Sequence, residues 1–317
     1  MRVVVIGGTG HIGTFLVPRL AEAGHSVVNV SRSRRLPYRP SAAWHDVEQL
    51  TLDRGSEESA GTFGRRICEA KPDAVVDLTC YTLESARQLV EPLRGNVSHF
   101  LHCGTIWVHG RSVEVPTREE HNRKPFGDYG CRKAAIEDFL LDEAAQNSFP
   151  ATVLHPGHLV GPGWTPINPV GNFNLNVFRD LARGEEVALP NLGMETLHHV
   201  HADDVAQCFV RVLAHRSVAV GESFHVVSPA AVTLYGYAHI VASWFGRSPQ
   251  LNFVPWQEWK QSATDREAET TWGHITRSSN CSIEKAQRLV GYTPRYTSFE
   301  ATREAVFALI DNKTLEV

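Results

Sequence analysis

The sequence predicts an α/β protein whose core is a doubly wound parallel sheet, followed by a smaller mixed α/β lobe. Three observations support this fold class. Short β-rich runs alternate with helical stretches through the first half of the 317 residues, which is typical of parallel sheets covered by helices. The first run leads directly into closely spaced glycines and then into a helical pattern. From Pro156 the composition shifts towards Pro, Gly and Asn, which marks a differently organised region.

The strongest local signal lies in the first 23 residues. Residues 3–6 form an unbroken apolar run, as expected of a strand buried on both faces, and a helical pattern with Phe15 and Leu20 on one side follows. Between them stand four glycines, Gly7, Gly8, Gly10 and Gly13. Such glycines allow a tight turn, let a pyrophosphate approach the backbone and place that anion at a helix N-terminus. We therefore expect a bound dinucleotide here; the alternative is a glycine-rich turn without a ligand.

Further elements follow in order along the chain. Strands are predicted at residues 26–31, 74–79, 99–104 and 151–155, and helices at 83–93, 129–146 and 202–215. Pro18 lies inside the first predicted helix and should kink it, because proline removes a backbone hydrogen bond.

The second half of the chain predicts the smaller lobe. Residues 156–176 look like a loop, with an irregular helix to follow, and residues 222–227, 234–245 and 251–254 suggest mixed elements. Two helices close the chain, at 282–290 before Gly291 and at 299–310, where Thr297 and Glu300 form a capping box. We expect a dinucleotide-binding core at 1–155 and a mainly substrate-binding lobe at 156–317, with residues 199–230 returning to the core.

Composition excludes several classes of function. The formal net charge is −4, which gives no nucleic-acid or membrane footprint, and no apolar run is long enough to span a bilayer. The 6 cysteines are widely scattered without a C-x-x-C pair, so they are interpreted as small buried residues of a reducing compartment. Met1 runs directly into the first strand without the pattern of a signal peptide. A cytoplasmic protein is expected.

The end of the second strand predicts which dinucleotide is bound. An acidic residue there would hold the ribose 2′-hydroxyl of NAD, whereas basic residues would hold the 2′-phosphate of NADP. This chain has no carboxylate at that point but has Ser31, Arg32 and Arg35, so NADP(H) is favoured and NAD(H) stays possible. A solvated basic turn is the alternative. Asp53 is expected to accept a hydrogen bond from the adenine amino group, or else to be an ordinary loop carboxylate.

A candidate catalytic group comes from two segments. Tyr129 and Lys133 are four residues apart at the start of a helix, so they share one face. A lysine ammonium and an oxidised nicotinamide would both favour the phenolate and lower the pKa of the tyrosine. Thr105 follows the strand at 99–104, at the sheet edge where such folds place their chemistry, and its hydroxyl can hold the substrate oxygen. Taken alone, a Y-x-x-x-K spacing would indicate only two exposed residues on the surface of a helix.

With these motifs in place, the chain resembles the extended short-chain dehydrogenase/reductases, the NAD(P)-dependent epimerase/dehydratase group. The resemblance covers nearly the whole length. It rests on GGTGHIG at 7–13, DLT at 77–79, GTIWVHG at 104–110, YGCRK at 129–133, HPGHLVGPG at 155–163, HVHADDVA at 199–206 and SIEKAQRLVGYTP at 282–294. It implies a Rossmann domain, a C-terminal substrate lobe, a homodimer formed through the long helices, and Thr105, Tyr129 and Lys133 as the catalytic group.

The resemblance also implies binding residues. Those for the cofactor are Gly7, Gly10, His11, Ile12, Gly13, Leu78, Thr79, Lys133 and His155, and those for the substrate are Tyr81, Trp107, His158, Asn172 and His199. Three departures weaken the case for an ordinary nucleotide sugar. Leu197 stands where sugar-nucleotide members have a diphosphate-binding arginine, His155-Pro-Gly-His158 replaces Arg-Pro-x-Asn, and His109 replaces the tyrosine of a Tyr-Gly pair.

A cluster of histidines and aspartates could suggest a metal site. His199 and His201 would share one face of a strand, and Asp203 and Asp204 follow them. The spacing matches no known metal site closely, so no metal is expected. A structural junction is favoured instead, with Asp203 or Asp204 capping the following helix.

The sequence therefore predicts an NAD(P)(H)-dependent oxidoreductase or redox epimerase that acts on a secondary alcohol or ketone of a sugar or sugar-like molecule, possibly a nucleotide sugar. Two alternatives stay open. Trp107, Trp164 and Phe173 near the expected site also suit a reductase of phenolic or polyketide ketones. The segment at 189–204 resembles chloroplast RNA-binding members of the superfamily, which suggests a dinucleotide- or RNA-binding protein without catalysis.

Overall fold

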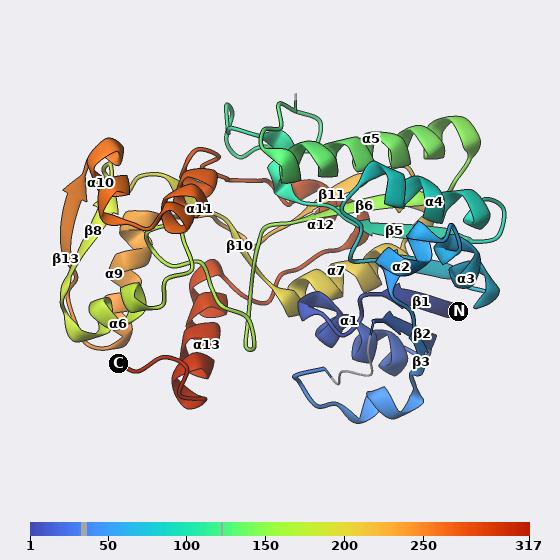
Figure 1. The fold of residues 1–317 in the computed structure, drawn as a ribbon, viewed down its shortest axis with the longest axis horizontal. Coiled ribbons are helices and arrows are strands. Elements are labelled where there is room, and N and C mark those ends of the chain that lie inside the picture. The colour runs from blue at the N-terminus through green and yellow to red at the C-terminus, as the bar shows by residue number, and fades with distance from the viewer. Residues whose placement is uncertain (33–36, 122) are drawn as a thin grey trace.

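A seven-stranded parallel sheet forms the centre of the molecule, with a second lobe beside it (Figure 1). The computed structural model describes residues 1–32, 37–121 and 123–317. The strands follow the order β11-β6-β5-β4-β1-β2-β3, and every neighbouring pair is parallel. Their bounds are β1 Arg2–Ile6, β2 Ser26–Ser31, β3 Glu48–Thr51, β4 Ala74–Asp77, β5 His99–Cys103, β6 Ala151–Pro156 and β11 Ser223–Val226.

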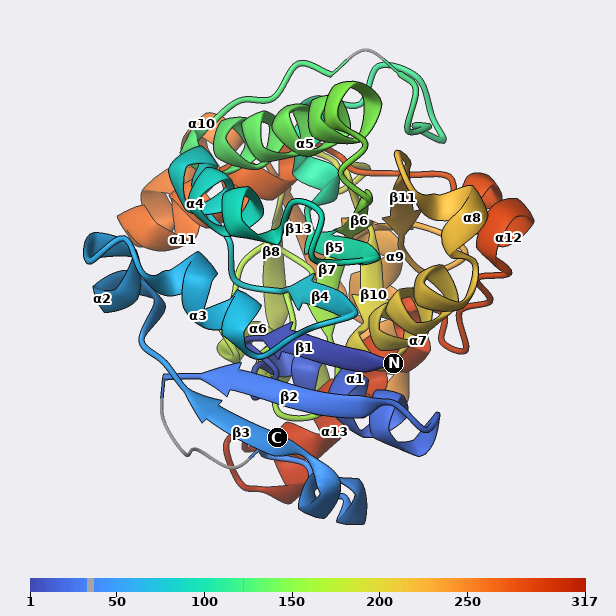
Figure 2. The same cartoon turned by 90° about the vertical axis from the view of Figure 1, so that its right-hand side faces the viewer.

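Helices cover both faces of this sheet (Figures 1 and 2). Alternation along β1 explains the two layers, because successive side chains of a strand point to opposite faces. Val3 and Val5 pack with α1 (His11–Glu22) and α7 (Ala202–Ala214). Val4 and Ile6 pack on the opposite face, with the apolar sides of α3 (Phe63–Glu69), α4 (Leu83–Leu93) and α5 (Asp128–Asn147). Burial on both faces is why β1 is apolar throughout.

The strand order places a topological switch point between β1 and β4. From β1 the chain builds β2 and β3 on one side, then returns to build β4, β5 and β6 on the other. In open α/β sheets, ligands bind outside the carboxyl ends of the strands at such a point. The glycine turn after β1 and the segments after β4 and β5 therefore meet at one edge of the sheet.

The second lobe is a mixed α/β unit made of short elements around its own apolar core. Three two-stranded ladders pair β7 (His158–Val160) with β10 (His199–His201), β9 (Thr196–Leu197) with β12 (Val232–Thr233), and β8 (Glu186–Pro190) with β13 (Gln250–Val254). Its helices are α6 (Asn176–Arg183), α9 (Leu234–Trp244), α10 (Trp256–Ser262), α11 (Asp265–Ile275) and α13 (Ser298–Asp311). The segment 156–176 is thus not all loop, because it contains β7. The chain returns to the large sheet through α7 and β11.

Most predicted elements are confirmed within a residue or two. The α4 bounds match the prediction, and α13 begins with the predicted capping box of Thr297 and Glu300. α12 (Glu284–Val290) ends before Gly291, which adopts a left-handed conformation. Pro18 lies buried inside α1, which continues beyond it to Glu22, and the kink expected there stays a prediction.

Several short elements were not predicted. In the sheet domain they are β3, α2 (Arg54–Ser59), α3, α8 (Arg216–Ala219), and the 3-10 helices η1 (Ala42–Asp46) and η2 (Ile106–His109). In the second lobe they include β8, β9, β12, α10 and α11. Within the described ranges, no helix has the length and apolarity needed to cross a bilayer.

Candidate active site

The glycine turn between β1 and α1 has the geometry of a phosphate cradle. Gly7 has a φ of +87°, and Gly10 donates its N–H to the Gly7 carbonyl at 3.0 Å. A Cβ on Gly13 would lie 2.3 Å from the Gly8 carbonyl oxygen, so the helix crosses this turn at backbone contact. Gly10 caps α1 without a side-chain hydrogen bond, which leaves N–H groups of the first turn pointing outward. The turn fits a dinucleotide pyrophosphate at His11 and Ile12.

The segment after β4 packs directly against this turn. A Cβ on Gly7 would lie 2.4 Å from Cγ2 of Thr79 and 3.6 Å from Cβ of Leu78. The fold therefore brings three of the residues predicted for the cofactor, Gly7, Leu78 and Thr79, to one place.

The end of β2 carries the residues predicted to select the dinucleotide. Ser31 is the last residue of β2, and Arg32 follows it in an exposed position. Asp53 caps α2, where its Oδ1 accepts the Ser56 N–H at 2.8 Å. That hydrogen bond, and more weakly the nearby Arg32 charge, lower the pKa of Asp53. Asp53 is therefore a helix-capping carboxylate. Its predicted hydrogen bond with the adenine amino group stays a prediction. Arg35 lies outside the described residues.

An aromatic contact over the glycine turn was not predicted. The His11 ring stacks on Trp164, with centroids 4.9 Å apart, and its Nδ1 shares a hydrogen bond with the Tyr38 hydroxyl. Burial lowers the pKa of His11 to about 4, so the ring is neutral at physiological pH. Trp164 belongs to the loop after β7, so His11 joins the sheet domain to the second lobe. Tyr38 had no spacing signal because it sits in an irregular loop.

The predicted catalytic residues converge beyond the carboxyl end of β5. The Thr105 hydroxyl lies close enough to the Tyr129 phenol for a side-chain hydrogen bond that favours the phenolate. Lys133 is 2% exposed, and its Nζ lies 6.0 Å from the centre of the Tyr129 ring. Nζ donates to the carbonyl oxygens of Cys80 and Cys103, at 2.7 Å each, so it ties α5 to the ends of β4 and β5.

The pKa of Tyr129 is raised in the protein alone, whereas the sequence predicts that Lys133 and an oxidised nicotinamide together lower it. Burial raises the pKa of the phenol, the Cys103 and Tyr81 groups add to that rise, and the Thr105 hydrogen bond opposes it. Burial also lowers the pKa of Lys133, whose ammonium is already bonded to two carbonyls. The positive charge of an oxidised nicotinamide would add to the Thr105 hydrogen bond in favouring the phenolate.

Residues predicted for the substrate fall into two groups. Tyr81, Trp107 and His158 lie near the catalytic residues: the Tyr81 ring centre is 4.9 Å from Lys133 Nζ, and Trp107 contacts the Tyr129 ring edge-on at 5.9 Å. Trp107 Nε1 donates to His158 Nε2 at 3.5 Å. The buried His199 ring lies 6.0 Å from the His158 ring, and both of its nitrogens lack hydrogen-bond partners.

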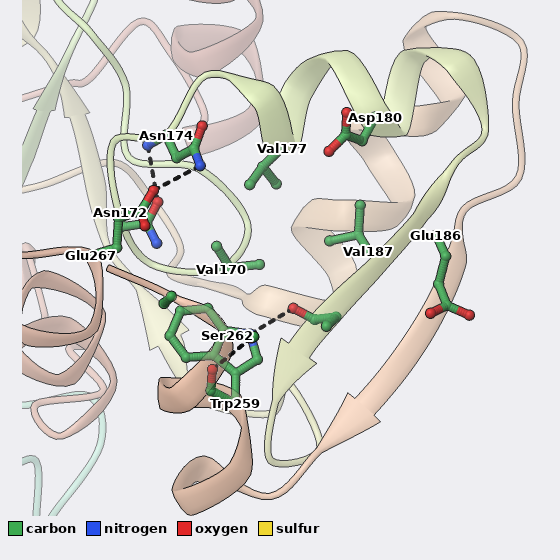
Figure 3. A pocket seen from close by; sticks show the side chains of 12 residues that line it. Val170, Asn172, Asn174, Val177, Asp180, Glu186, Val187, Trp259, Ser262 and Glu267 are labelled. Carbon is green, nitrogen blue, oxygen red and sulfur yellow. Dashed lines mark hydrogen bonds between the residues drawn. The ribbon is translucent and has the colours of Figure 1, made fainter. Parts of the chain in front are cut away.

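Asn172 lies elsewhere, in the core of the second lobe. Its side chain donates to Thr271 at 3.1 Å and accepts from Asn168 at 2.6 Å. It lines a cavity of about 160 Å³ with Asn174, Trp259 and Glu267 (Figure 3). None of the three catalytic residues lines that cavity, so its relation to the substrate stays a prediction.

Arg277 is a cation beside Trp107 that sequence spacing did not indicate. Its guanidinium stacks 3.7 Å from the centre of the Trp107 ring and 3.9 Å from that of Phe126, and it donates to the carbonyls of Gly273 and Phe126. Burial lowers its pKa to about 10. Leu197, at the position where the resembling enzymes have arginine, is fully buried in β9 and cannot contact a phosphate.

His155 was predicted to bind the cofactor, but both of its ring nitrogens have partners within the protein. Nδ1 accepts the Thr105 backbone N–H at 3.0 Å, and Nε2 lies 2.9 Å from Oε1 of Glu137. Glu137 also pairs with Arg123. Glu137 was missed, although its position four residues after Lys133 on the same helical face was visible in the sequence.

Glu137 predicts a pH dependence of stability. The partners His155 and Arg123 outweigh burial and lower its pKa from 4.5 to about 2. A carboxylate with a depressed pKa stabilises the fold above its unfolded value, and that contribution, about 3 kcal/mol, is lost as the pH falls from about 4.5 to about 2. We expect Glu137→Gln to flatten this part of the pH profile of the free energy of unfolding, measured by urea denaturation. Glu258→Gln, an exposed carboxylate on α10, should keep the wild-type slope; equal slopes in all three proteins would contradict the assignment.

The histidine–aspartate junction is structural, but the predicted cap is wrong. His201, not Asp203 or Asp204, caps α7, and its Nδ1 accepts the Asp203 N–H at 3.0 Å. Asp203 instead makes two hydrogen bonds of 2.7 Å with Arg19, because α1 packs beside α7. Asp204 accepts the backbone N–H groups of Arg295 and Tyr296.

One group of potential metal ligands occurs among the residues that the structure describes. Asp77, Cys80 and His102 are buried, with ligand atoms within 4.8 Å of one another. Asp77 is already paired with Arg54 at 2.8 Å, and Lys133 donates to the Cys80 carbonyl. Arg54 and Lys133 are two buried cations beside this group, and their charges disfavour the binding of a metal cation there.

The switch point, the glycine turn and the residues after β5 define a class of α/β protein. Such a protein has a glycine turn suited to a dinucleotide and a Thr–Tyr–Lys group at the same end of the parallel sheet. The chain belongs to the NAD dependent epimerase/dehydratase family, whose model matches residues 3–226. The resemblance inferred from the motifs is thereby confirmed. Proteins similar to the chain include a 2′-dehydrokanamycin reductase, a dTDP-6-deoxy-L-talose 4-dehydrogenase and a UDP-glucose 4-epimerase.

Individual relatives are distant. The chain is 26% identical to 2′-dehydrokanamycin reductase of Streptomyces kanamyceticus over 68% of its own length and 58% of that protein. It is 24% identical to the chloroplast stem-loop binding protein of 41 kDa b of Arabidopsis thaliana, over 96% of this chain and 78% of that one. The crystal structure of UDP-glucose 4-epimerase from Thermotoga maritima has the same fold, with a TM-score of 0.74, 21% identity and full coverage of both chains.

Proposed function

We propose that this chain is an NAD(P)(H)-dependent oxidoreductase or redox epimerase for a secondary alcohol or ketone of a sugar or sugar-like molecule. The observation that carries the proposal is the meeting of Thr105, Tyr129 and Lys133 at the sheet edge that also holds the glycine turn. Family membership and the reductase named above support the same reaction class.

In the proposed mechanism the protein positions the substrate and moves one proton. The Thr105 hydroxyl holds the substrate oxygen. The Tyr129 phenolate takes the proton of an alcohol in the oxidation, and the Tyr129 phenol gives its proton to the oxygen of a ketone in the reduction. Lys133 holds α5 against the ends of β4 and β5 and, in this proposal, also contacts the nicotinamide ribose. When bound, the nicotinamide accepts or supplies the hydride at the substrate carbon.

NADP(H) is the proposed cofactor, because Arg32 is the described cation at the end of β2. Arg32→Ala is expected to weaken NADPH binding about tenfold, since a charge-assisted hydrogen bond to a phosphate contributes about 1.5–3 kcal/mol. NADH binding should change by less than about twofold, since NADH has no 2′-phosphate. Arg266→Ala, an exposed arginine on α11, is the control. Cofactor fluorescence titration measures both; equal losses for the two cofactors would rule out a 2′-phosphate contact.

The reaction is tested with a panel of sugars, nucleotide sugars and aromatic ketones, followed by the absorbance of the reduced cofactor. Net oxidation or reduction of a sugar supports an oxidoreductase. Sugar interconversion without net absorbance change supports a redox epimerase. The mass of any ligand retained through purification identifies which dinucleotide is held. No turnover across the panel, with cofactor bound, would contradict the sugar proposal.

The same panel tests one alternative function, and RNA retention tests another. The aromatic contacts of Trp107 with Tyr129 and Arg277 would suit a phenolic or polyketide ketone, which would then be the substrate reduced. Likeness to the stem-loop binding protein favours an RNA-binding role, which requires salt-dependent RNA retention without any cofactor oxidation. The net charge of −4 disfavours an RNA-binding role.

The proposal also includes a homodimer and a cytoplasmic location. The cytoplasmic location is proposed because the six cysteines are free.

A further inference from the structure

The catalytic residue Thr105 is joined to two further buried residues, His155 and Glu137, by consecutive hydrogen bonds. The Thr105 backbone N–H donates to Nδ1 of His155 at 3.0 Å, and Nε2 of His155 lies 2.9 Å from Oε1 of Glu137. The exposed fractions of Thr105, His155 and Glu137 are 7%, 1% and 3%. They come from the end of β5, from β6 and from α5, so the bonds connect three elements of the site.

These bonds fix the tautomer of His155. Nδ1 accepts an N–H, so it carries no proton, and the ring proton sits on Nε2, where it donates to the Glu137 carboxylate. Glu137 is itself held by Arg123, which also pairs with Asp138. A histidine held from one side by a carboxylate keeps one orientation, and its other nitrogen is then a fixed acceptor.

The backbone before Thr105 packs against the same ring. A Cβ on Gly104 would lie 2.5 Å from Nδ1 and 2.8 Å from Cε1 of His155, so the ring contacts the peptide directly. The residue that carries the substrate-holding hydroxyl is therefore fixed through its own N–H and through the glycine before it. The Thr105 hydroxyl accepts the Trp107 N–H at 3.3 Å as the cap of η2, and it also faces the Tyr129 phenol.

Neutral histidine suits both contacts, because it offers a donor to Glu137 and an acceptor to Thr105 at once. A side chain with donors alone, such as arginine, could pair with Glu137 but could not accept the Thr105 N–H.

We propose that His155 is a positioning residue: oriented by Glu137, it holds the backbone of Thr105 so that the threonine hydroxyl faces the Tyr129 phenol. This inference rests on the proposed function, in which Thr105 holds the substrate oxygen. A positioning role predicts a loss in kcat with little change in KM, because a small displacement of a catalytic group costs about 100-fold in rate.

Two variants of His155 separate its contacts. In His155→Asn the amide oxygen stands near the place of Nδ1 and can accept from Thr105, but the side chain is too short for Glu137. In His155→Gln the amide nitrogen reaches Glu137, but the acceptor for Thr105 is lost. We expect kcat of the Asn variant within about tenfold of wild type and kcat of the Gln variant lower by about 100-fold, with both KM values within about threefold. Glu143→Gln is the matched control: Glu143 is a buried carboxylate on the same helix, paired with Arg94 away from the site, and kcat should stay unchanged.

Two readouts need no substrate. Amide exchange of Thr105, followed by NMR, should stay slow in wild type and His155→Asn and become fast in His155→Gln. The ¹⁵N shifts of the wild-type ring should report the Nε2–H tautomer. A wild-type ring protonated at Nδ1, or Asn and Gln variants with equal kcat and equal Thr105 protection, would overturn the inference. Failure of the proposed function looks different: Tyr129→Phe would then turn over like wild type while the Thr105 exchange results stand.

Discussion

Replacement of Tyr129 by phenylalanine is expected to lower kcat by about 1,000-fold, since general acid–base catalysis contributes about 10²–10⁴-fold. The phenol is the group that moves the proton in the proposed reaction, and the Thr105 hydroxyl lies beside it. The change removes one oxygen and keeps the ring, so the edge contact with Trp107 and the position of α5 should persist. Cofactor affinity should stay within about threefold, because the pyrophosphate is bound at the glycine turn.

The control for this variant is Tyr235→Phe. Tyr235 is also partly exposed, 39% against 42% for Tyr129, but it lies on α9 of the second lobe. It should retain wild-type kcat and thermal stability. Stopped-flow measurement of hydride transfer and titration with reduced cofactor provide the two readouts. Turnover of Tyr129→Phe close to that of wild type would remove this tyrosine from the mechanism.

The fold was predictable where local signals and tertiary packing agree. β1 is apolar throughout because both of its faces are buried, and α13 carries its start signal in Thr297 and Glu300. β3 escaped prediction because its sequence, EQLT, lies at the sheet edge with mostly exposed side chains and no apolar pattern. α3 has only Phe63 and Ile67 as a buried pair, too short a pattern to recognise.

The site was predictable in part for the same reason. Tyr129 and Lys133 share a helix, so their spacing fixes their relation. His155 and Glu137 come from different elements, and only the packing of α5 on β6 shows that they bond. The role of Lys133 was also set by tertiary structure, because the carbonyls that hold it belong to Cys80, in the segment after β4, and to Cys103, the last residue of β5. Sequence spacing carries no information about such contacts.

Gly13→Ala is expected to abolish dinucleotide binding and to lower the free energy of unfolding by more than about 3 kcal/mol, since forced overpacking costs about 1–3 kcal/mol and here the neighbour is backbone. The new Cβ would lie 2.3 Å from the carbonyl oxygen and 2.4 Å from the carbonyl carbon of Gly8. Neither atom can turn away as a side chain could, so α1 must move off the turn that follows β1. The N–H groups that would hold the pyrophosphate move with it.

Gly55→Ala tests whether this loss is specific to the turn. Gly55 is also a helical glycine, in α2, but a Cβ there would meet only Oδ1 of Asp53 at 3.5 Å, an ordinary contact. Alanine has the higher helix propensity, so Gly55→Ala should leave stability equal to wild type or up to about 1 kcal/mol higher. Urea unfolding and cofactor titration of both variants give the comparison. Wild-type cofactor affinity in Gly13→Ala would mean that the dinucleotide is not held at the start of α1, because no placement of the helix accommodates both the methyl group and the unchanged cradle.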